Sequence, residues 1–191
     1  MGNSQIHPQG WISVGIEPTH EARAKRMRDR RDLQYRNIFT EADTDKRWVG
    51  DLGEWVFKSW ISHEGIQGFS WILENAAGQP DFVSPLNIRI GVKTVKRQRP
   101  PRDGYTAQIT ARHAEEPIDH FFFMTYDFNQ RRMWLLGGID HASFMKEARY
   151  YGSGEWVHDN YQVREEHGIF NIDVAKLIQP KPWLTKVTQA K

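Results

Sequence analysis

The sequence predicts an α/β protein, on three observations. Apolar residues recur at helical spacing from Lys46 to Ser62, as on a helix with one buried face. Asn87–Val95 and His120–Asp127 are apolar runs of strand length that are bounded by turn residues. Pro18–Phe39 has a helical but strongly basic composition. We therefore expect a sheet flanked by helices, with a basic helix near the N-terminus.

Chain length suggests one domain with an appended arm. A chain of 191 residues has the usual size of a single domain, and its 39% apolar and 13% aromatic residues can build a core. We expect an irregular N-terminal arm over residues 1–17 and a single domain over residues 18–191. The core of that domain is expected at about residues 46–150.

Composition also excludes several functions. The chain contains no cysteine, which excludes disulfides, thiolate zinc sites and cysteine nucleophiles. Its N-terminus lacks the layout of a signal peptide, and no apolar run is long enough to span a bilayer. We expect a soluble, cytoplasmic protein with no membrane partner. The net charge of +2 does not by itself indicate a nucleic-acid partner.

The distribution of charge is more informative than its sum. In Pro18–Phe39, arginines that include Arg26 and Arg30 outnumber the acids, and apolar residues are too sparse for a buried stripe. Such a helix is either simply solvated or contacts phosphates, whose oxygens match the arginine fork.

A second basic segment follows the strand Asn87–Val95. Between Glu74 and Asp103 the only acid is Asp81. The basic residues of this segment are Lys96, Arg97, Arg99 and Arg102, interrupted by Pro100-Pro101. A stiff basic loop of this kind is expected to hold a polyanion such as DNA.

The helix expected over Lys46–Ser62, capped by Asp43-Thr44-Asp45, carries a carboxylate beside its apolar face. Gly50 and Gly53 lower its helix propensity, which is tolerable if the helix must approach a sheet closely. Glu54 lies beside the buried stripe, where a carboxylate usually has a partner. Lys58, one turn further on, is one such partner.

The segment Gly78–Lys93 reads as two short strands joined by a turn at Ser84-Pro85. The first strand holds Asp81, and the second places Gly91 and Lys93 on one face and Val92 on the other. An acid and an amine on paired strands can hold a divalent metal and activate a water molecule. The alternative is that both residues only favour solubility.

The remaining elements are shorter. We expect strands at Gly68–Glu74, Tyr105–Ala111 and Arg132–Ile139, a loop at His113–Pro117, a helix capped by Asp140 and ending near Tyr150, a hairpin at Trp156–Arg164, and a helix at Ile172–Ile178 that Pro180-Lys181-Pro182 ends before a tail with Trp183.

Three of these segments together resemble a known family. The helix motif Gly-Asp-Leu-Gly-Glu-Trp (Gly50–Trp55), then Pro80-Asp81, then a strand with Val92-Lys93-Thr94 is similar to the PD-(D/E)XK nuclease superfamily. The resemblance covers roughly Val49 to Ile139, with a similar strand-strand-helix order to about Tyr150. It implies a restriction-endonuclease-like core, in which helices flank a central mixed sheet.

The resemblance also implies a site. Asp81 would bind a metal ion, Lys93 would activate water or stabilise developing charge, and Glu54 would be a further ligand. The backbone carbonyl of Val92 could also reach the metal. Mg²⁺ or Mn²⁺ would then promote attack of water on a phosphodiester of DNA. The family further implies a prokaryotic or phage-encoded protein, with a homodimer as one way to cut both strands.

One position departs from the family pattern. The second acid of the motif should stand two residues before Lys93, where this chain has Gly91. Three explanations are open: one metal bound through Asp81, Glu54 and the backbone; another acid, with Glu74 nearest in sequence; or an inactive protein that still binds DNA.

Other functions fit parts of the sequence. His158-Asp159-Asn160 and His167 could belong to a histidine-based nuclease, although their spacing is not that of a paired-histidine metal site. A non-catalytic DNA-binding or scaffold protein would use the same basic segments. A protein–protein module could use the eight tryptophans as anchors, but most of them fit core positions.

Overall fold

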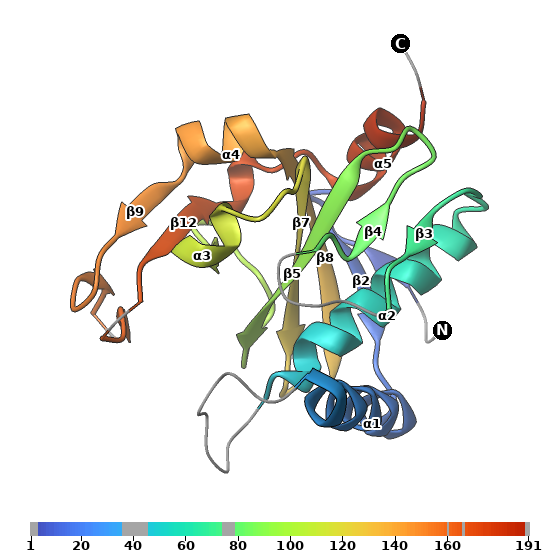
Figure 1. Cartoon of the computed structure of the whole chain (residues 1–191), viewed down its shortest axis with the longest axis horizontal. Helices are drawn as coiled ribbons and strands as arrows, with labels where there is room; N and C mark the ends of the chain where they lie inside the picture. Colours follow the sequence, from blue (N-terminus) through green and yellow to red (C-terminus); the bar gives the residue numbers. More distant parts are fainter. Residues whose placement is uncertain (1–3, 36–45, 74–78, 160, 166, 190–191) are drawn as a thin grey trace.

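The computed structural model describes residues 4–35, 46–73, 79–159, 161–165 and 167–189. Its main feature is a large, curled, mixed sheet of seven strands with helices packed against it (Figure 1). Across the sheet the strands are β1 (Gln5–Ile6), β2 (Ile12–Gly15), β8 (Arg132–Asp140), β7 (His120–Asp127), β5 (Arg89–Arg97), β4 (Phe82–Val83) and β3 (Ser70–Trp71). β5 and β7 are parallel, and every other neighbouring pair is antiparallel. The expectation of an α/β protein with a mixed sheet flanked by helices is therefore confirmed.

The central strand β7 is buried on both faces, which explains why its sequence is a continuous apolar run. All eight of its residues are buried. Because side chains alternate along a strand, Phe121 and Phe123 join one core cluster, whereas Phe122 and Met124 join the other. The sheet thus separates two hydrophobic cores.

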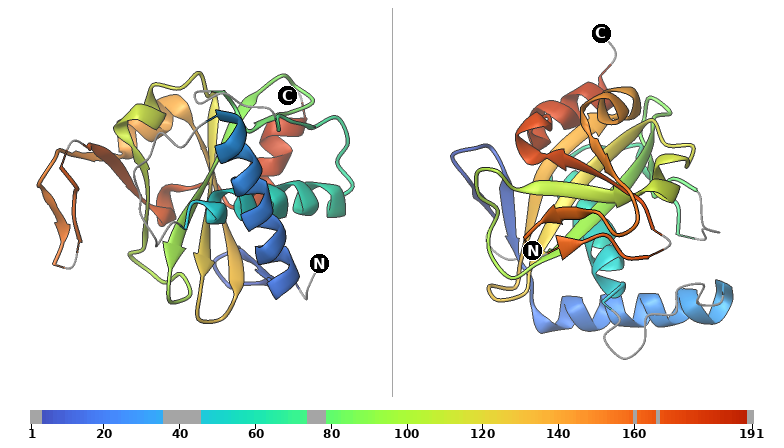
Figure 2. Two further views of the ribbon diagram at one scale, coloured as in Figure 1. Left: turned by 60° about the horizontal axis from the view of Figure 1, so that its bottom comes forward. Right: turned by 90° about the vertical axis from the view of Figure 1, so that its left-hand side faces the viewer.

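Helices cover the first face of the sheet. α2 (Trp48–His63) lies along it, α5 (Pro180–Thr188) packs beside β8, and α1 (Pro18–Tyr35) crosses one end of α2 (Figure 2). Gly53 brings α2 close to β5, since a Cβ atom there would lie 1.9 Å from Thr94 Oγ1. The expected reason for a glycine in this helix is confirmed at Gly53. It does not hold at Gly50, where a Cβ would meet nothing within 4 Å.

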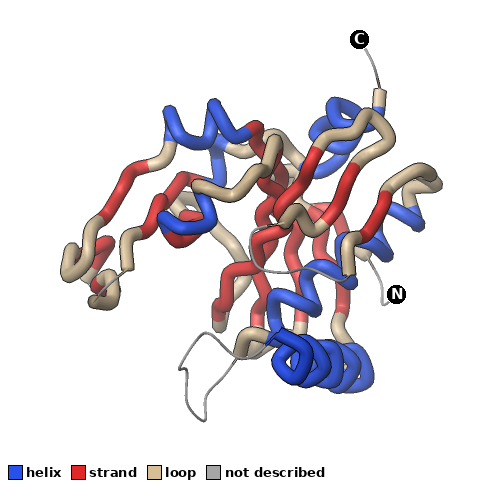
Figure 3. Tube along the Cα trace, viewed as in Figure 1, coloured by secondary structure: helices blue, strands red, loops and turns tan. Residues whose placement is uncertain are grey.

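A smaller sheet covers the second face (Figure 3). Its three antiparallel strands are, in order, β6 (Thr106–Thr110), β12 (Ile169–Asp173) and β9 (Arg149–Tyr151). The short helices α3 (Ala111–Ala114) and α4 (His141–Glu147) adjoin it, and β10 (Trp156–His158) and β11 (Tyr161–Gln162) form a separate hairpin. Asp140 caps α4 as expected, its Oδ1 accepting a hydrogen bond from the Ser143 amide at 2.9 Å.

The expectation of an irregular arm over residues 1–17 is wrong for part of that segment. Ile12–Gly15 pairs with β8, and Ile12 and Val14 are buried in the core. Alternation over four residues is a weak local signal, and the strand exists because β8, far along the chain, supplies its partner. Gln5–Ile6 and Ile12–Gly15 are therefore part of the main sheet.

Two expectations near the C-terminus are also wrong. The helix expected at Ile172–Ile178 is instead the end of β12 followed by a single 3₁₀ turn, Val174–Lys176. Pro180 begins α5 and does not terminate a helix, because a proline in the first turn loses no helical hydrogen bond. α5 then buries Trp183 fully, against Gly138, where a Cβ would lie 2.3 Å from Trp183 Nε1.

Smaller differences concern the site itself. The strand expected over Gly68–Glu74 is reduced to Ser70–Trp71, and Asp81 precedes β4 instead of lying within it. Part of the loop expected at His113–Pro117 belongs to α3. The proposed cap Asp43-Thr44-Asp45 and Glu74 lie outside the described residues. In the part of the chain that is described, no helix is both long and apolar enough to cross a membrane.

Candidate functional site

Asp81 lies at the point where β4 begins and is held against the backbone of β5. Its amide donates to the carbonyl of Ile90 at 3.0 Å, and its Oδ2 accepts a hydrogen bond from the amide of Val92 at 2.7 Å. In an antiparallel ladder the N–H and C=O of one residue face the same neighbouring strand. The carbonyl of Val92 therefore faces the edge on which Asp81 lies, beyond the start of β4.

Glu54 reaches toward the same region from α2. It is only 6% exposed, and its carboxylate is bound by both terminal nitrogens of Arg31, at 2.9 and 2.8 Å. Trp71 Nε1 donates a third hydrogen bond at 3.1 Å. The partner suggested from the sequence, Lys58, instead lies over the Trp71 ring, 4.9 Å from its centroid. Glu54 thus has a partner, as a buried carboxylate requires, but the partner comes from α1.

Lys93 projects from the face of β5 that carries Gly91. Its Nζ lies 3.2 Å from Oε2 of Glu116, and the two side chains are only 16% and 13% exposed. The Lys93 chain runs back along the strand, because a Cβ at Gly91 would lie 3.4 Å from Lys93 Cε. The amine is therefore directed toward the end of β5 at which Asp81 is bound.

Glu116 was not predicted from the sequence. It lies in the segment that enters β7, which the sequence predicted only as a loop. β5 and β7 are parallel, with Gly91 opposite Phe121, so the residues that enter β7 lie beside the start of β5. An acid just before a buried parallel strand was the available signal, but it required knowing which strands pair.

The pKa of Asp81 depends on the charges of several of these residues. Burial is the largest cause that raises the pKa of the Asp81 carboxyl, and the nearby Glu54 carboxylate raises it further. Lys93 and the Val92 amide oppose this shift, and Glu116 adds to it. Glu54, Lys93 and Glu116 are therefore all close enough to Asp81 to act on its charge. Lys93 lies 3.2 Å from Glu116 and directly follows Val92, whose amide binds Asp81, whereas Glu54 is linked to Asp81 through its charge.

The donor chemistry of this region is suited to a hard divalent cation, which prefers oxygen ligands. The Asp81 carboxylate is held in place by the Val92 amide, and the Val92 carbonyl faces the same edge. Glu54 is less available, because Arg31 occupies both of its oxygens. As the side chains stand, the described ranges contain no group of three or more histidine, aspartate or glutamate residues spaced to hold a metal ion.

Arg31 and Arg28 anchor α1 to α2. Arg31 Nη1 and Arg28 Nη2 each lie 2.7 Å from the carboxylate of Asp51, which is fully buried. Burial raises the pKa of the Asp51 carboxyl to about 6, although both guanidinium groups oppose the shift. These two arginines therefore have a structural role, because their ion pairs hold α1 against α2.

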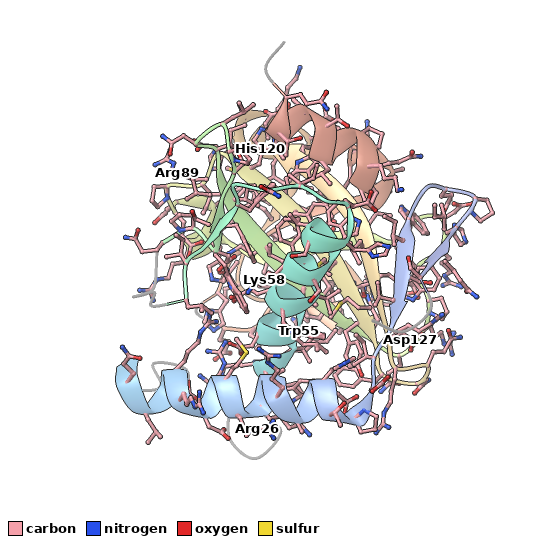
Figure 4. All side chains as sticks on the ribbon, turned by 90° about the vertical axis from the view of Figure 1, so that its right-hand side faces the viewer. Arg26, Trp55, Lys58, Arg89, His120 and Asp127 are labelled. Carbon is pink, nitrogen blue, oxygen red and sulfur yellow. The ribbon has the colours of Figure 1, made fainter. Side chains whose placement is uncertain are left out.

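The arginines predicted to bind nucleic acid on α1 are the exposed ones. Arg26 and Arg30 are exposed, and Figure 4 shows Arg26 on α1, beside the end of α2. Leu33 on the same helix is 86% exposed, consistent with a helix that has no continuous buried stripe.

The second basic segment divides in the same way. Lys96, Arg99 and Arg102 are exposed. Arg97 is not, since it donates to the carbonyls of Lys96 at 3.3 Å and Thr106 at 3.2 Å, and burial lowers its pKa. Arg97 therefore links β5 to β6. Its expected contact with DNA stays a prediction, and these hydrogen bonds within the protein do not favour it.

The histidines that could belong to a second kind of nuclease lie in or beside the β10–β11 hairpin. The ring of His158 is 5.9 Å from that of Tyr161. Figure 1 shows this hairpin at the periphery, well away from β4 and α2. His113 lies beside Glu116, with its Nε2 3.7 Å from Glu116 Oε1, and burial lowers its pKa to about 3.

Comparison with protein-family models and with curated proteins gave no match to this chain. The resemblance to the nuclease superfamily therefore stays a prediction from the motif residues.

Proposed function

We propose that the chain is a metal-dependent deoxyribonuclease with its reaction centre at Asp81 and Lys93. The observation that carries the proposal is that the Val92 amide holds the Asp81 carboxylate at 2.7 Å, directly before Lys93, whose amine lies 3.2 Å from Glu116. Glu54 adds a further carboxylate whose charge acts on Asp81. These residues come from α2, β5 and the segment before β7. Side chains that are far apart in sequence and share one buried, charged region are typical of a functional site.

The strand order supports the restriction-endonuclease-like core implied by the motif. α2 carries the glutamate and precedes three antiparallel strands, β3, β4 and β5. The chain then crosses over and returns as β7, parallel to β5. Pro80-Asp81 stands at the start of the second of these strands, and Val92-Lys93 lies within the third. This is the order in which the family places its motif residues.

Each residue has a role that follows from its position. The Val92 amide fixes the Asp81 carboxylate so that it faces the open edge beside β5. Lys93 holds an ammonium group there, which stabilises negative charge as it develops on a phosphate. A divalent cation bound at Asp81 and the Val92 carbonyl would supply charge neutralisation and activate water.

A DNA-binding surface would lie on the exposed basic residues. Arg26 and Arg30 project from α1, and Arg99 and Arg102 from the loop after β5. Removal of one side chain that binds a phosphate should reduce the slope of log binding constant against log salt by about 1. Replacement of Arg26 or Arg99 by alanine tests this surface separately from catalysis.

The test of the activity uses Asp81→Ala and Lys93→Ala with plasmid and oligonucleotide substrates in Mg²⁺ and in Mn²⁺. Each substitution should lower the cleavage rate by about 100-fold or more, while salt-sensitive DNA binding remains. Lys181→Ala is the control, because Lys181 is exposed on α5 and pairs with Glu64, at 3.4 Å, outside the site. Cleavage that survives Asp81→Ala would place the reaction elsewhere.

A second candidate is a DNA-binding protein that has the fold without the activity. The bidentate contact of Arg31 with Glu54 favours it, because it engages the carboxylate that the family uses as a ligand. On this alternative, neither the wild-type chain nor Gly91→Glu cleaves DNA, and both still bind it. Faster cleavage by Gly91→Glu would argue for the nuclease.

A further inference from the structure

The acid missing from position 91 has a counterpart elsewhere in the chain. We infer that Glu116 takes the place of the second motif carboxylate and completes the cation site with Asp81. This inference rests on the proposed nuclease function and adds a ligand that the motif does not contain.

The first support is location. The Glu116 carboxylate is 3.2 Å from the amine of Lys93, the residue that the missing acid should precede by two positions. Lys93 folds back over Gly91, so an acid at position 91 and the observed Glu116 would both lie beside the same amine. Position 91 on β5 and Glu116 in the segment before β7 therefore both place a side chain beside the Lys93 amine.

The second support is the environment. The Glu116 side chain is 13% exposed, whereas its neighbour Glu115 is exposed. A carboxylate that is withdrawn from solvent needs compensating charge. Lys93 supplies one positive charge beside Glu116, and Arg31 already balances Glu54. A divalent cation would balance the carboxylate of Asp81, which the Val92 amide holds at 2.7 Å.

The third support is that position 91 can accept a Cβ atom without a clash. A Cβ there would make ordinary contacts with Lys93 and with Ile118, at 3.4 and 3.5 Å. The backbone of Gly91 does not have the positive φ that would require glycine. Glycine at this position is therefore not required by the fold, and the acid can be returned to it as an experimental swap.

The experiment measures Mn²⁺ binding by calorimetry without DNA, and cleavage in parallel. Glu116→Gln should weaken Mn²⁺ binding by about tenfold or more and reduce cleavage, whereas Glu115→Gln should change neither. Gly91→Glu added to Glu116→Gln should restore both, and Gly91→Ala in the same background should not. Thermal unfolding of each variant checks that it is folded.

A role limited to pairing with Lys93 is distinguished by removing the lysine. In a Lys93→Met background, Glu116→Gln should still weaken Mn²⁺ binding if Glu116 is a ligand. No further loss there, or unchanged binding by Glu116→Gln alone, overturns the assignment of Glu116. If Mn²⁺ binding depends on Asp81 but not on Glu116, the proposed function stands without this inference. If the wild-type chain neither binds Mn²⁺ nor cleaves, both fail together.

Discussion

Substitution of Gly53 by alanine should destabilise the protein, against the usual effect of this change in a helix. Gly→Ala in a helix interior ordinarily stabilises by about 1 kcal/mol. At Gly53 the new Cβ would lie 1.9 Å from Thr94 Oγ1 and 3.1 Å from Thr94 Cβ, so α2 must move away from β5 or Thr94 must rotate. Overpacking of this kind costs about 1–3 kcal/mol, so we expect a net loss of up to about 2 kcal/mol.

Gly50→Ala is the matched control in the same helix. Its Cβ would meet nothing within 4 Å, so only the helix propensity changes, and it should stabilise by about 0.5–1 kcal/mol. Both variants can be measured by urea unfolding followed by tryptophan fluorescence. For a chain of this size, 1 kcal/mol corresponds to a change in Tm of about 2–4 °C.

A double variant tests whether Thr94 is the cause. Thr94 Oγ1 is buried without a hydrogen-bond partner among the described residues, so Thr94→Ala alone loses no hydrogen bond. It should recover much of the loss caused by Gly53→Ala, giving a coupling energy of about 1 kcal/mol or more. If Gly53→Ala stabilises the protein as Gly50→Ala does, the close approach of α2 to β5 is not as described.

Two further predictions concern the buried charges. Burial and Glu54 raise the pKa of Asp81 from 3.8 to about 7, so the folded state binds the extra proton and unfolding becomes easier as pH rises between these values. The free energy of unfolding of Asp81→Asn, measured in urea, should therefore rise relative to that of the wild type between pH 4.5 and pH 8. The same difference between the two proteins at both pH values would contradict the raised pKa. Arg31→Met leaves the Glu54 carboxylate buried without its ion pair and should destabilise by about 3–5 kcal/mol. Arg26→Met, on the exposed side of α1, should change the free energy of unfolding by less than about 0.5 kcal/mol in the same assay. If Arg31→Met and Arg26→Met lower the free energy of unfolding equally, the structural role assigned to Arg31 is wrong.

Elements with a strong local signal were predictable from the sequence. His120–Asp127 is a strand with the expected bounds, and the helix expected from Lys46 to Ser62 runs from Trp48 to His63. β2 and the final strand β12 were missed, because each is short and exists through pairing with a distant strand. Local periodicity carries no information about a partner that lies far away along the chain.

The candidate site shows the same division. Glu54, Asp81 and Lys93 were chosen because their order along the chain follows a motif, and their role as a site stays a prediction. Arg31 and Glu116 could not, since nothing near either residue in sequence indicates what it contacts. Arg31 was grouped with the solvated arginines of α1, yet its guanidinium holds two buried carboxylates. Ion pairs between elements depend on packing, which the sequence pattern does not specify.

The pairing of β2 with β8 has a consequence for how the chain matures. The two strands are separated by more than a hundred residues, so a nascent chain released gradually from the ribosome exposes Ile12 and Val14 until residues 132–135 have emerged. During that interval the N-terminal strand is an unpaired apolar segment, open to chaperones or to self-association. Slowing translation after β8 has emerged from the ribosome should have little effect on the yield of native protein, whereas slowing it before β8 emerges should lower it.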